Sequence, residues 1–308
     1  MLEIKDNLKI ENIYAAGVFQ DEKPTEFLNG FNDRVEAVFV LSGKLTVAAE
    51  TNIYECNAGT AAIFAPGEIH YISLSQKEYT EYLLVSFSAS GEDLSYLNSV
   101  TSLSVLQKQL VLSVCNQISA DNEYNVLLPS AFEDEFASSK LAATLELLAI
   151  EISSNKTAIS PFKKRDALLF EQAVAEMQNN VLNKLSLEEL AGELEISLSH
   201  LKRIFASFTD VGAHEYFMVL KIRKSIELLQ SGHSVTETAK LTGFNNQNYF
   251  SAAFKRITGA QAKDYCSVKK RKVTRTTENV SKPIRTVKAN SAPAPAKKPT
   301  SDMPNYLL

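Results

Sequence analysis

Two stretches in the second half of the chain decide its fold: SLEELAGELEISLSHLKRIF at 186–205 and SVTETAKLTGFNNQNYFSAAF at 234–254. They correspond at an offset of 48 residues as far as Ile196 and Phe244, and at an offset of 49 after an extra residue in the second turn. Each has the apolar spacing of a short helix, a turn and a second amphipathic helix. The sequence therefore predicts a helix-turn-helix unit that occurs twice.

Both units open with a serine that is followed three residues later by a glutamate: Ser186 with Glu189, and Ser234 with Glu237. In such a capping box the serine hydroxyl accepts a hydrogen bond from the amide of the glutamate, and the glutamate carboxylate accepts one from the amide of the serine. The first turn of a helix leaves amides without partners, and the box satisfies two of them. We therefore expect a helix to begin directly after each serine.

Residues 213–230, AHEYFMVLKIRKSIELLQ, join the two units and carry apolar side chains for packing against both. A recognition helix lies in the major groove of DNA and reaches only a few base pairs. Two such helices on one rigid frame can enter successive major grooves, about 34 Å apart. This arrangement predicts a protein that binds double-stranded DNA.

The same region resembles the DNA-binding domain of the AraC/XylS family of transcription regulators. The resemblance extends over residues 166–267, and GFNNQNYFSAAFKRITG at 243–259 is close to the family's signature. The first half resembles the family's cupin-like sensing domain through LSGKL at 41–45, the turn at 57–59 and APGEIHYI at 65–72. The resemblance implies a monomeric or homodimeric regulator, most often an activator that recruits RNA polymerase.

The expected fold class is α+β, with a cupin-like β-barrel and dimerisation helices followed by an all-α domain with two helix-turn-helix motifs. Short runs of β-branched and aromatic residues between 35 and 90 predict the strands. An apolar stripe predicts an amphipathic helix, which either packs on its own domain or forms a dimer face; it consists of Phe136, Leu141, Leu145, Leu148 and Ile152. The expected segments are 1–155 for the sensing and dimerisation domain, 156–165 for a linker, 166–267 for the DNA-binding domain with units at 186–207 and 234–257, and 268–308 for a basic, disordered tail.

Carried over position by position, the resemblance implies DNA contacts from both recognition helices. Arginine and lysine suit guanine edges or phosphates, whereas asparagine and glutamine suit adenine edges. Near the end of the second helix, Lys255 and Arg256 suit phosphates better than bases. The candidate DNA-binding residues are Ser197, Ser199, His200, Lys202, Arg203, Asn246, Gln247, Asn248, Ser251, Lys255 and Arg256. The apolar and aromatic residues of the same helices are expected to lie in the core and not to contact DNA; they are Ile204, Phe205, Tyr249, Phe250 and Phe254.

Two departures from the family pattern make the units unequal. Arg203 in the first recognition helix corresponds to Ala252 in the second, where the family often has arginine. Glu195 takes the place of the glycine that usually occupies the turn of the first unit. We therefore expect the first unit to supply the stronger polar contacts.

The net charge of −4 is distributed unevenly along the chain. Residues 1–162 hold 9 Lys and Arg against 22 Asp and Glu, residues 163–267 hold 13 against 12, and residues 268–308 hold 10 against 2. The acidic first half is not expected to bind a polyanion, and DNA binding at 163–267 must depend on where its charges lie. The tail either adds phosphate affinity or is a dispensable extension.

The sequence also argues against a membrane protein and against a metal enzyme. No apolar run approaches the roughly 20 residues of a membrane span, residues 1–12 lack the apolar region of a signal peptide, and the three cysteines have no metal-ligand spacing. A catalytic cupin needs two histidines and a glutamate close together, but His70 is the sole histidine before His200. We therefore expect a cytoplasmic regulator without cofactor or enzymatic activity, and a cupin-type metal enzyme is a remote alternative.

What the first half senses is left open by the sequence. One hypothesis is a small effector held inside the barrel; the candidate lining residues are Phe39, Leu41, Phe64, His70, Tyr71 and Leu84. The other is a regulatory protein partner, or control by abundance without any ligand. The operator, the target genes and the sign of regulation are not predicted by the sequence.

Overall fold

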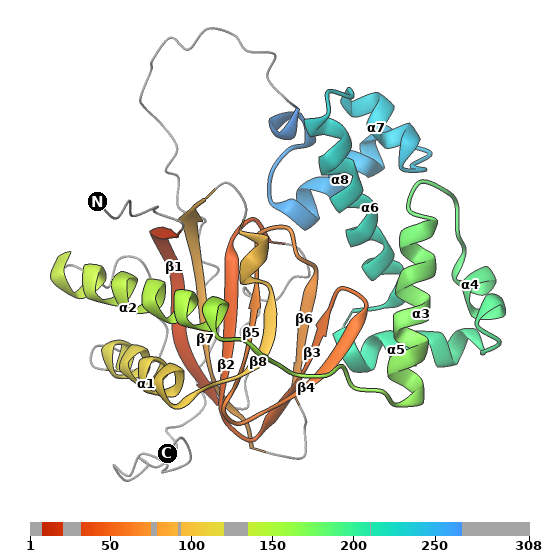
Figure 1. Cartoon of the computed structure of the whole chain (residues 1–308). Coiled ribbons are helices and arrows are strands. Elements are labelled where there is room, and N and C mark those ends of the chain that lie inside the picture. Colours follow the sequence, from red (N-terminus) through yellow and green to blue (C-terminus); the bar gives the residue numbers. More distant parts are fainter. Residues whose placement is uncertain are drawn as a thin grey trace, which may run out of the picture.

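The computed structural model describes residues 8–20, 32–74, 79–91, 94–119, 135–209 and 211–266. It has the predicted α+β class, with sheets in the first half of the chain and helices in the second (Figure 1). The predicted tail at 268–308 lies outside the described residues. Within these ranges, none of the helices combines the length and the apolarity that crossing a bilayer requires.

In the described residues the strands form two antiparallel sheets. The larger sheet has the order β1-β7-β2-β5-β8-β9 and the smaller has the order β4-β3-β6. The strands are β1 (Lys9–Gln20), β2 (Val35–Ser42), β3 (Lys44–Ala49), β4 (Asn52–Asn57), β5 (Thr60–Phe64), β6 (His70–Leu74), β7 (Glu81–Ser90), β8 (Ser99–Ser102) and β9 (Thr157–Ala158).

The two sheets pack face to face and, in the described part of the chain, do not close into the single barrel that we expected. The chain passes from the larger sheet to the smaller one at Gly43, between β2 and β3. Gly43 has a φ of +70°, and a Cβ there would lie 2.0 Å from the carbonyl oxygen of Tyr79. Only glycine fits this corner, where the strand leaves one sheet and enters the other.

Strand β2 is buried on both faces because it lies between two layers. Val38 and Val40 point between the sheets, where they pack with residues of β3 such as Val47. Ala37 and Phe39 point to the other side, toward α1 and α2. Successive residues of a strand face opposite ways, so a strand that is covered on both faces has an almost continuous apolar sequence.

Helices α1 (Val105–Ser119) and α2 (Glu135–Ser154) cover the outer face of the larger sheet (Figure 1). Glu146 of α2 accepts a hydrogen bond of 2.7 Å from the amide of Ile10 on β1. Most of the predicted apolar stripe packs on this sheet; the buried members are Leu141, Leu145, Leu148 and Ile152. Phe136, at the start of α2, is 86% exposed and does not share this burial.

The segment between α2 and α3 is held against the sheets. β9 pairs with β8, and the amide of Phe162 donates to the carbonyl oxygen of Ile53 on β4 at 2.6 Å. A helical bundle follows: α3 (Arg165–Asn179), α4 (Leu187–Glu193), α5 (Leu198–Thr209), α6 (Ala213–Gln230), α7 (Val235–Leu241) and α8 (Gln247–Thr258).

Both predicted capping boxes are present and start the first helix of each unit. At α4 the Ser186 hydroxyl accepts from the Glu189 amide at 3.1 Å, and the Glu189 carboxylate accepts from the Ser186 amide at 2.8 Å. At α7 the corresponding distances between Ser234 and Glu237 are 3.2 and 2.9 Å. These bonds lower the pKa of each glutamate, because they favour the charged carboxylate.

Helix α6 is the common support of the two units. Its residues 216–222 are all buried. These seven residues make up about two turns, so the helix is covered on every side. One face carries Tyr216 and Leu220 and packs with α3 and α5. Another face carries Ile222 and Leu229 and packs with α7 and α8.

The smaller sheet packs against the same bundle, beside α3, α5 and α6 (Figure 1). Tyr71 of β6 lies against Tyr216, with ring centroids 5.5 Å apart. The Tyr216 hydroxyl donates to the backbone carbonyl of Glu50 at 2.9 Å, and the Glu50 carboxylate pairs with Arg223 and accepts from Gln178 at 3.2 Å. Glu50, in the turn between β3 and β4, thus joins the sheet half to α3 and α6.

We predict that Glu50→Gln lowers the free energy of unfolding by about 1–2 kcal/mol, because the half-buried Arg223 loses its charged partner. Glu55→Gln, on the exposed side of the neighbouring β4, is the matched control and should change stability by less than about 0.5 kcal/mol. Urea denaturation of the full chain measures both. Equal losses for the two variants would contradict the prediction.

Candidate nucleic-acid interface

Helix α5 exposes one polar stripe and buries the opposite face. Ser199, Lys202 and Arg203 are exposed, at the spacing of three and four residues that places side chains on one side of a helix. Leu201 and Phe205 are buried on the other side. The structure therefore brings three of the five candidate residues of the first unit onto one exposed face.

Helix α8 exposes the corresponding stripe, 49 residues further along the chain. It contains Asn248, Ser251, Ala252 and Lys255, all exposed. In the first unit the two cations lie together in the middle of the stripe, at Lys202 and Arg203, whereas the sole cation of the second stripe is Lys255, one turn beyond Ser251. The two stripes occupy corresponding positions on their helices but differ in charge.

Three candidate residues act at the start of the second helix of each unit. The Ser197 hydroxyl accepts from the amide of His200 at 3.1 Å. The Asn246 side chain accepts from the amide of Asn248 at 2.7 Å, as the N-cap of α8. Gln247 accepts at 3.1 Å from the hydroxyl of Thr236 on α7. These three side chains position the second helix of each unit by local bonds.

Two further candidates are paired with carboxylates of the same chain. His200 faces α3 and lies 3.1 Å from the carboxylate of Asp166. Arg256, near the end of α8, pairs with Glu215 at the start of α6, and this pairing raises the pKa of the guanidinium. Their proposed role in DNA contact would require these pairs to be shared with phosphate or to open.

The turns of the two units have the same backbone conformation with different residues. Gly243 has a φ of +76° and Glu195, at the corresponding position, has a φ of +54°. A residue with a Cβ is disfavoured there by about 1–2 kcal/mol. The replacement of glycine by Glu195 therefore leaves the turn intact but adds strain to the first unit.

The exposed aromatic on α8 was missed by sequence reasoning. We expected Tyr249 to lie in the core, but it is 54% exposed, next to Asn248. Its ring centroid is 6.0 Å from that of Phe244, so it packs at the rim of the core. Its position directly after Asn248, at the start of the recognition helix, is the signal that could have indicated a surface role.

The six candidate lining residues of the sheet half are distributed over three different layers. Phe39 and Leu41 pack toward α1 and α2, and Phe64 and Leu84 pack between the sheets. Tyr71 packs against the helical bundle. The described residues therefore do not bring these five side chains around one cavity, and their role in effector binding stays a prediction.

His70, the sixth, has both ring nitrogens occupied. Nε2 lies 2.7 Å from a carboxylate oxygen of Glu36, and Nδ1 lies 3.1 Å from the carbonyl oxygen of Glu68. The ring stacks on Phe64 with centroids 3.8 Å apart and is 1% exposed. These contacts make His70 a buried hydrogen-bonding group that ties β6 to β2.

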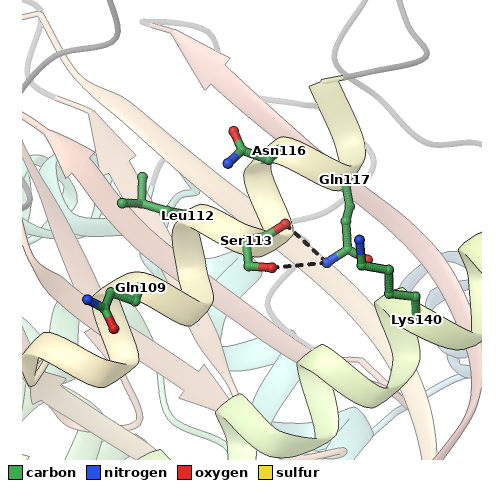
Figure 2. A pocket seen from close by; sticks show the side chains of 6 residues that line it. All are labelled: Gln109, Leu112, Ser113, Asn116, Gln117 and Lys140. Atoms are coloured by element: carbon green, nitrogen blue, oxygen red, sulfur yellow. Dashed lines mark hydrogen bonds between the residues drawn. The ribbon is translucent and has the colours of Figure 1, made fainter.

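Two cavities lie elsewhere in the described residues. One, of about 520 Å³, lies on the outward side of α1 and α2, where Gln117 donates to the backbone and hydroxyl oxygens of Ser113 (Figure 2). Its lining consists of Gln109, Leu112, Ser113, Asn116, Gln117 and Lys140. The other, of about 290 Å³, lies between α3 and α6 and includes Gln178 and Arg223, both partners of Glu50.

The comparisons with known proteins agree on the helical half. The family model of the AraC-type helix-turn-helix domain matches residues 190–267, which include α5 to α8. An uncharacterized helix-turn-helix-type transcriptional regulator of Pseudoalteromonas carrageenovora is 28% identical over 113 residues, which cover 37% of this chain and 68% of that protein. Residues 190–267 are therefore a helix-turn-helix domain of the AraC type, as the sequence predicted, and this relative is a DNA-binding transcription regulator.

Two further similarities extend over most of the chain. The uncharacterized regulator YdiP of Escherichia coli (strain K12) is 21% identical, and the alignment covers 83% of this chain and 88% of YdiP. The structure of unsaturated fatty acid-bound ToxT from Vibrio cholerae is 16% identical, with a TM-score of 0.34 and coverage of 83% and 96% of the two chains. These relatives are named as transcription regulators and not as enzymes, which agrees with the prediction of a regulator.

We predict that Arg203→Ala lowers the affinity for a specific site more than Asn248→Ala does. Arg203 offers a bidentate cationic contact worth about 1–3 kcal/mol, and the second stripe has Ala252 at the same place. The measurement is a binding titration of both variants at one fixed salt concentration. Equal losses of affinity for the two variants would contradict the prediction that the first unit makes the stronger contacts.

Proposed function

We propose that this regulator is a cytoplasmic protein that binds one DNA site with both recognition helices. We also propose that it activates transcription by recruiting RNA polymerase. The observation that carries the proposal is the pair of corresponding exposed stripes on α5 and α8. Buried apolar residues behind each stripe anchor it to α6, which leaves the polar side chains available for the major groove.

The proposed DNA contacts have different roles in the two units. Lys202 and Arg203 are exposed in the middle of their helix and suit base edges or phosphates. Asn248 and Ser251 suit base edges, and Lys255 suits a phosphate. Ser199 lies on the same exposed stripe as Lys202 and Arg203 and suits a base edge. The other candidates, whose side chains already have partners within the protein, support these contacts.

Control by the sheet half is supported by its contacts with α6. Tyr216 and Arg223, both on α6, bind Glu50 of the smaller sheet. A ligand that changes the position of this turn would act on the helix that carries both units. We propose a small effector as the controlling ligand, and a regulatory protein or control by abundance is the alternative.

A homodimer is part of the proposal as well. The apolar residues of α2 that face away from the sheet include Leu147 and Ile150, and both are exposed. Leu106 adds an exposed apolar side chain on the neighbouring α1. These residues, rather than the buried stripe of the same helix, are the ones that support association of the sheet halves.

Genome-wide mapping of binding sites, followed by footprinting and transcription with purified RNA polymerase, tests DNA binding and activation. We predict two protected segments with centres about 10 base pairs apart, and more transcript when the regulator is added. A regulator in which Arg203 and Lys255 are both changed to alanine is the control for the transcript. If the regulator shows no sequence preference, the proposed sequence-specific binding is refuted. If it lowers the amount of transcript, the proposed activation is refuted, but sequence-specific binding is not.

Thermal unfolding of the full chain in the presence of metabolite pools distinguishes the effector from its alternatives. We predict that one pool raises the melting temperature, since a ligand at 100 times its dissociation constant stabilises the folded state by about 2.7 kcal/mol. The active compound must also change the affinity for the mapped site. Retrieval of a protein partner, with no shift from any pool, would reject the small effector.

A further inference from the structure

Lys221 lies in the middle of α6, and its ammonium contacts two separate turns of the helical half. The residue is 8% exposed. Its Nζ donates to the carbonyl oxygens of Val181 at 3.0 Å and Asn183 at 2.9 Å, in the segment that leads from α3 into the first unit. It also donates at 2.9 Å to the carbonyl oxygen of Thr242, which ends α7 in the second unit.

The chemistry of this contact fits a charged lysine. An ammonium has three N–H donors, and three carbonyl oxygens accept from it. Thr242 caps the C-terminal end of α7, where the helix dipole and unpaired carbonyls favour a cation. Burial lowers the pKa of Lys221 to about 8, which leaves the ammonium as the major form at neutral pH.

The two turns also approach each other directly beside Lys221. A Cβ at Gly243 would lie 3.3 Å from the Lys221 Nζ and 3.4 Å from the carbonyl oxygen of Asn183. The φ of +76° at Gly243 is a second reason for glycine. Ser225 lies one turn further along α6 and places its hydroxyl 3.4 Å from that of Thr242.

Elsewhere the second unit is held on α6 by the apolar cluster that includes Ile222 and Leu229, and by contacts at the C-terminal end of α8. There Arg256 pairs with Glu215 of α6, and Ile257 packs against the apolar clusters of both units. Apolar packing has no direction, so it holds α7 and α8 on α6 without fixing the angle between the two units. The Lys221 contact adds directed hydrogen bonds between the two turns, at the end of α7, and restricts that angle.

We propose that Lys221 is a positioning residue that sets the separation and orientation of the recognition helices α5 and α8. This rests on the proposed function, in which both helices contact one DNA site. Lys221 touches carbonyl groups and no exposed stripe, so its effect on DNA binding is exerted through the geometry of the two units.

The test is the dependence of affinity on half-site spacing. The full-length wild type, Lys221→Met and the control Lys224→Met are titrated against the mapped site and against the same site with five base pairs inserted between the half-sites. Lys224 is the neighbouring lysine of α6 and pairs with Glu227. Urea denaturation of each variant measures the folded fraction separately.

We expect the insertion to weaken wild-type and Lys224→Met binding by at least about tenfold, because a rigid pair of helices cannot follow both half-sites. Lys221→Met should bind the mapped site about tenfold more weakly than the wild type does. The insertion of five base pairs should then weaken the binding of this variant by less than about a further threefold. Partial unfolding alone would weaken binding to both sites equally and would leave this ratio unchanged. Lys221→Arg, which keeps the donors, should recover part of the wild-type ratio.

A folded Lys221→Met with the wild-type spacing ratio would overturn the inference. If that variant does not fold, Gly243→Ala separates the same turns by the added Cβ, and a folded Gly243→Ala with an unchanged ratio would overturn it equally. If the affinity of the wild type does not depend on the half-site spacing, the proposed binding of one DNA site by both recognition helices is refuted instead. The two failures are therefore distinguishable.

Discussion

The burial of α6 on all sides is the constraint on which the rest of the structure depends. Over residues 216–222 every side chain is covered, and its surroundings differ from one face to the next. Tyr216 reaches the smaller sheet and the first unit, whereas Ile222 reaches the second unit. Because hydrophobic burial has no direction, it can bring these parts together without fixing the angles between them.

Directional contacts fix those angles. Glu50 binds both the hydroxyl of Tyr216 and the guanidinium of Arg223, and Lys221 binds carbonyl groups of two turns. The apolar clusters place the layers in the order α1 and α2, the larger sheet, the smaller sheet, and the helical bundle. The polar contacts lie at the last junction of this order and inside the bundle, where orientation matters most for binding DNA.

Much of the helical half could be predicted from the sequence because its signals are local. Ser186 and Glu189 lie three residues apart, so their bonds depend on little outside one turn of helix. The apolar spacing of α5 and α8 likewise predicted which side chains are buried, except for Tyr249 at the rim of the core. The match between Arg203 and Ala252 followed from the repeat alone.

The features that the sequence did not reveal depend on contacts between distant segments. His200 binds Asp166, which is 34 residues away, and Arg256 binds Glu215, which is 41 residues away; neither pair has a periodic signal. The candidate lining residues Phe39 and Phe64 were separated in the same way, because alternation along a strand predicts two faces without saying what covers each.

The shared position of α6 also has a consequence for how this protein can change during evolution. A substitution at one of its buried positions alters the packing of more than one neighbour, so compensating changes are needed in several segments at once. Among the described residues, the exposed polar positions on the outward faces of α1 and α2, apart from the proposed dimer contact, have no such constraint. We therefore expect sequence drift to be slow in the central helix and fast at those polar positions of the outer helices.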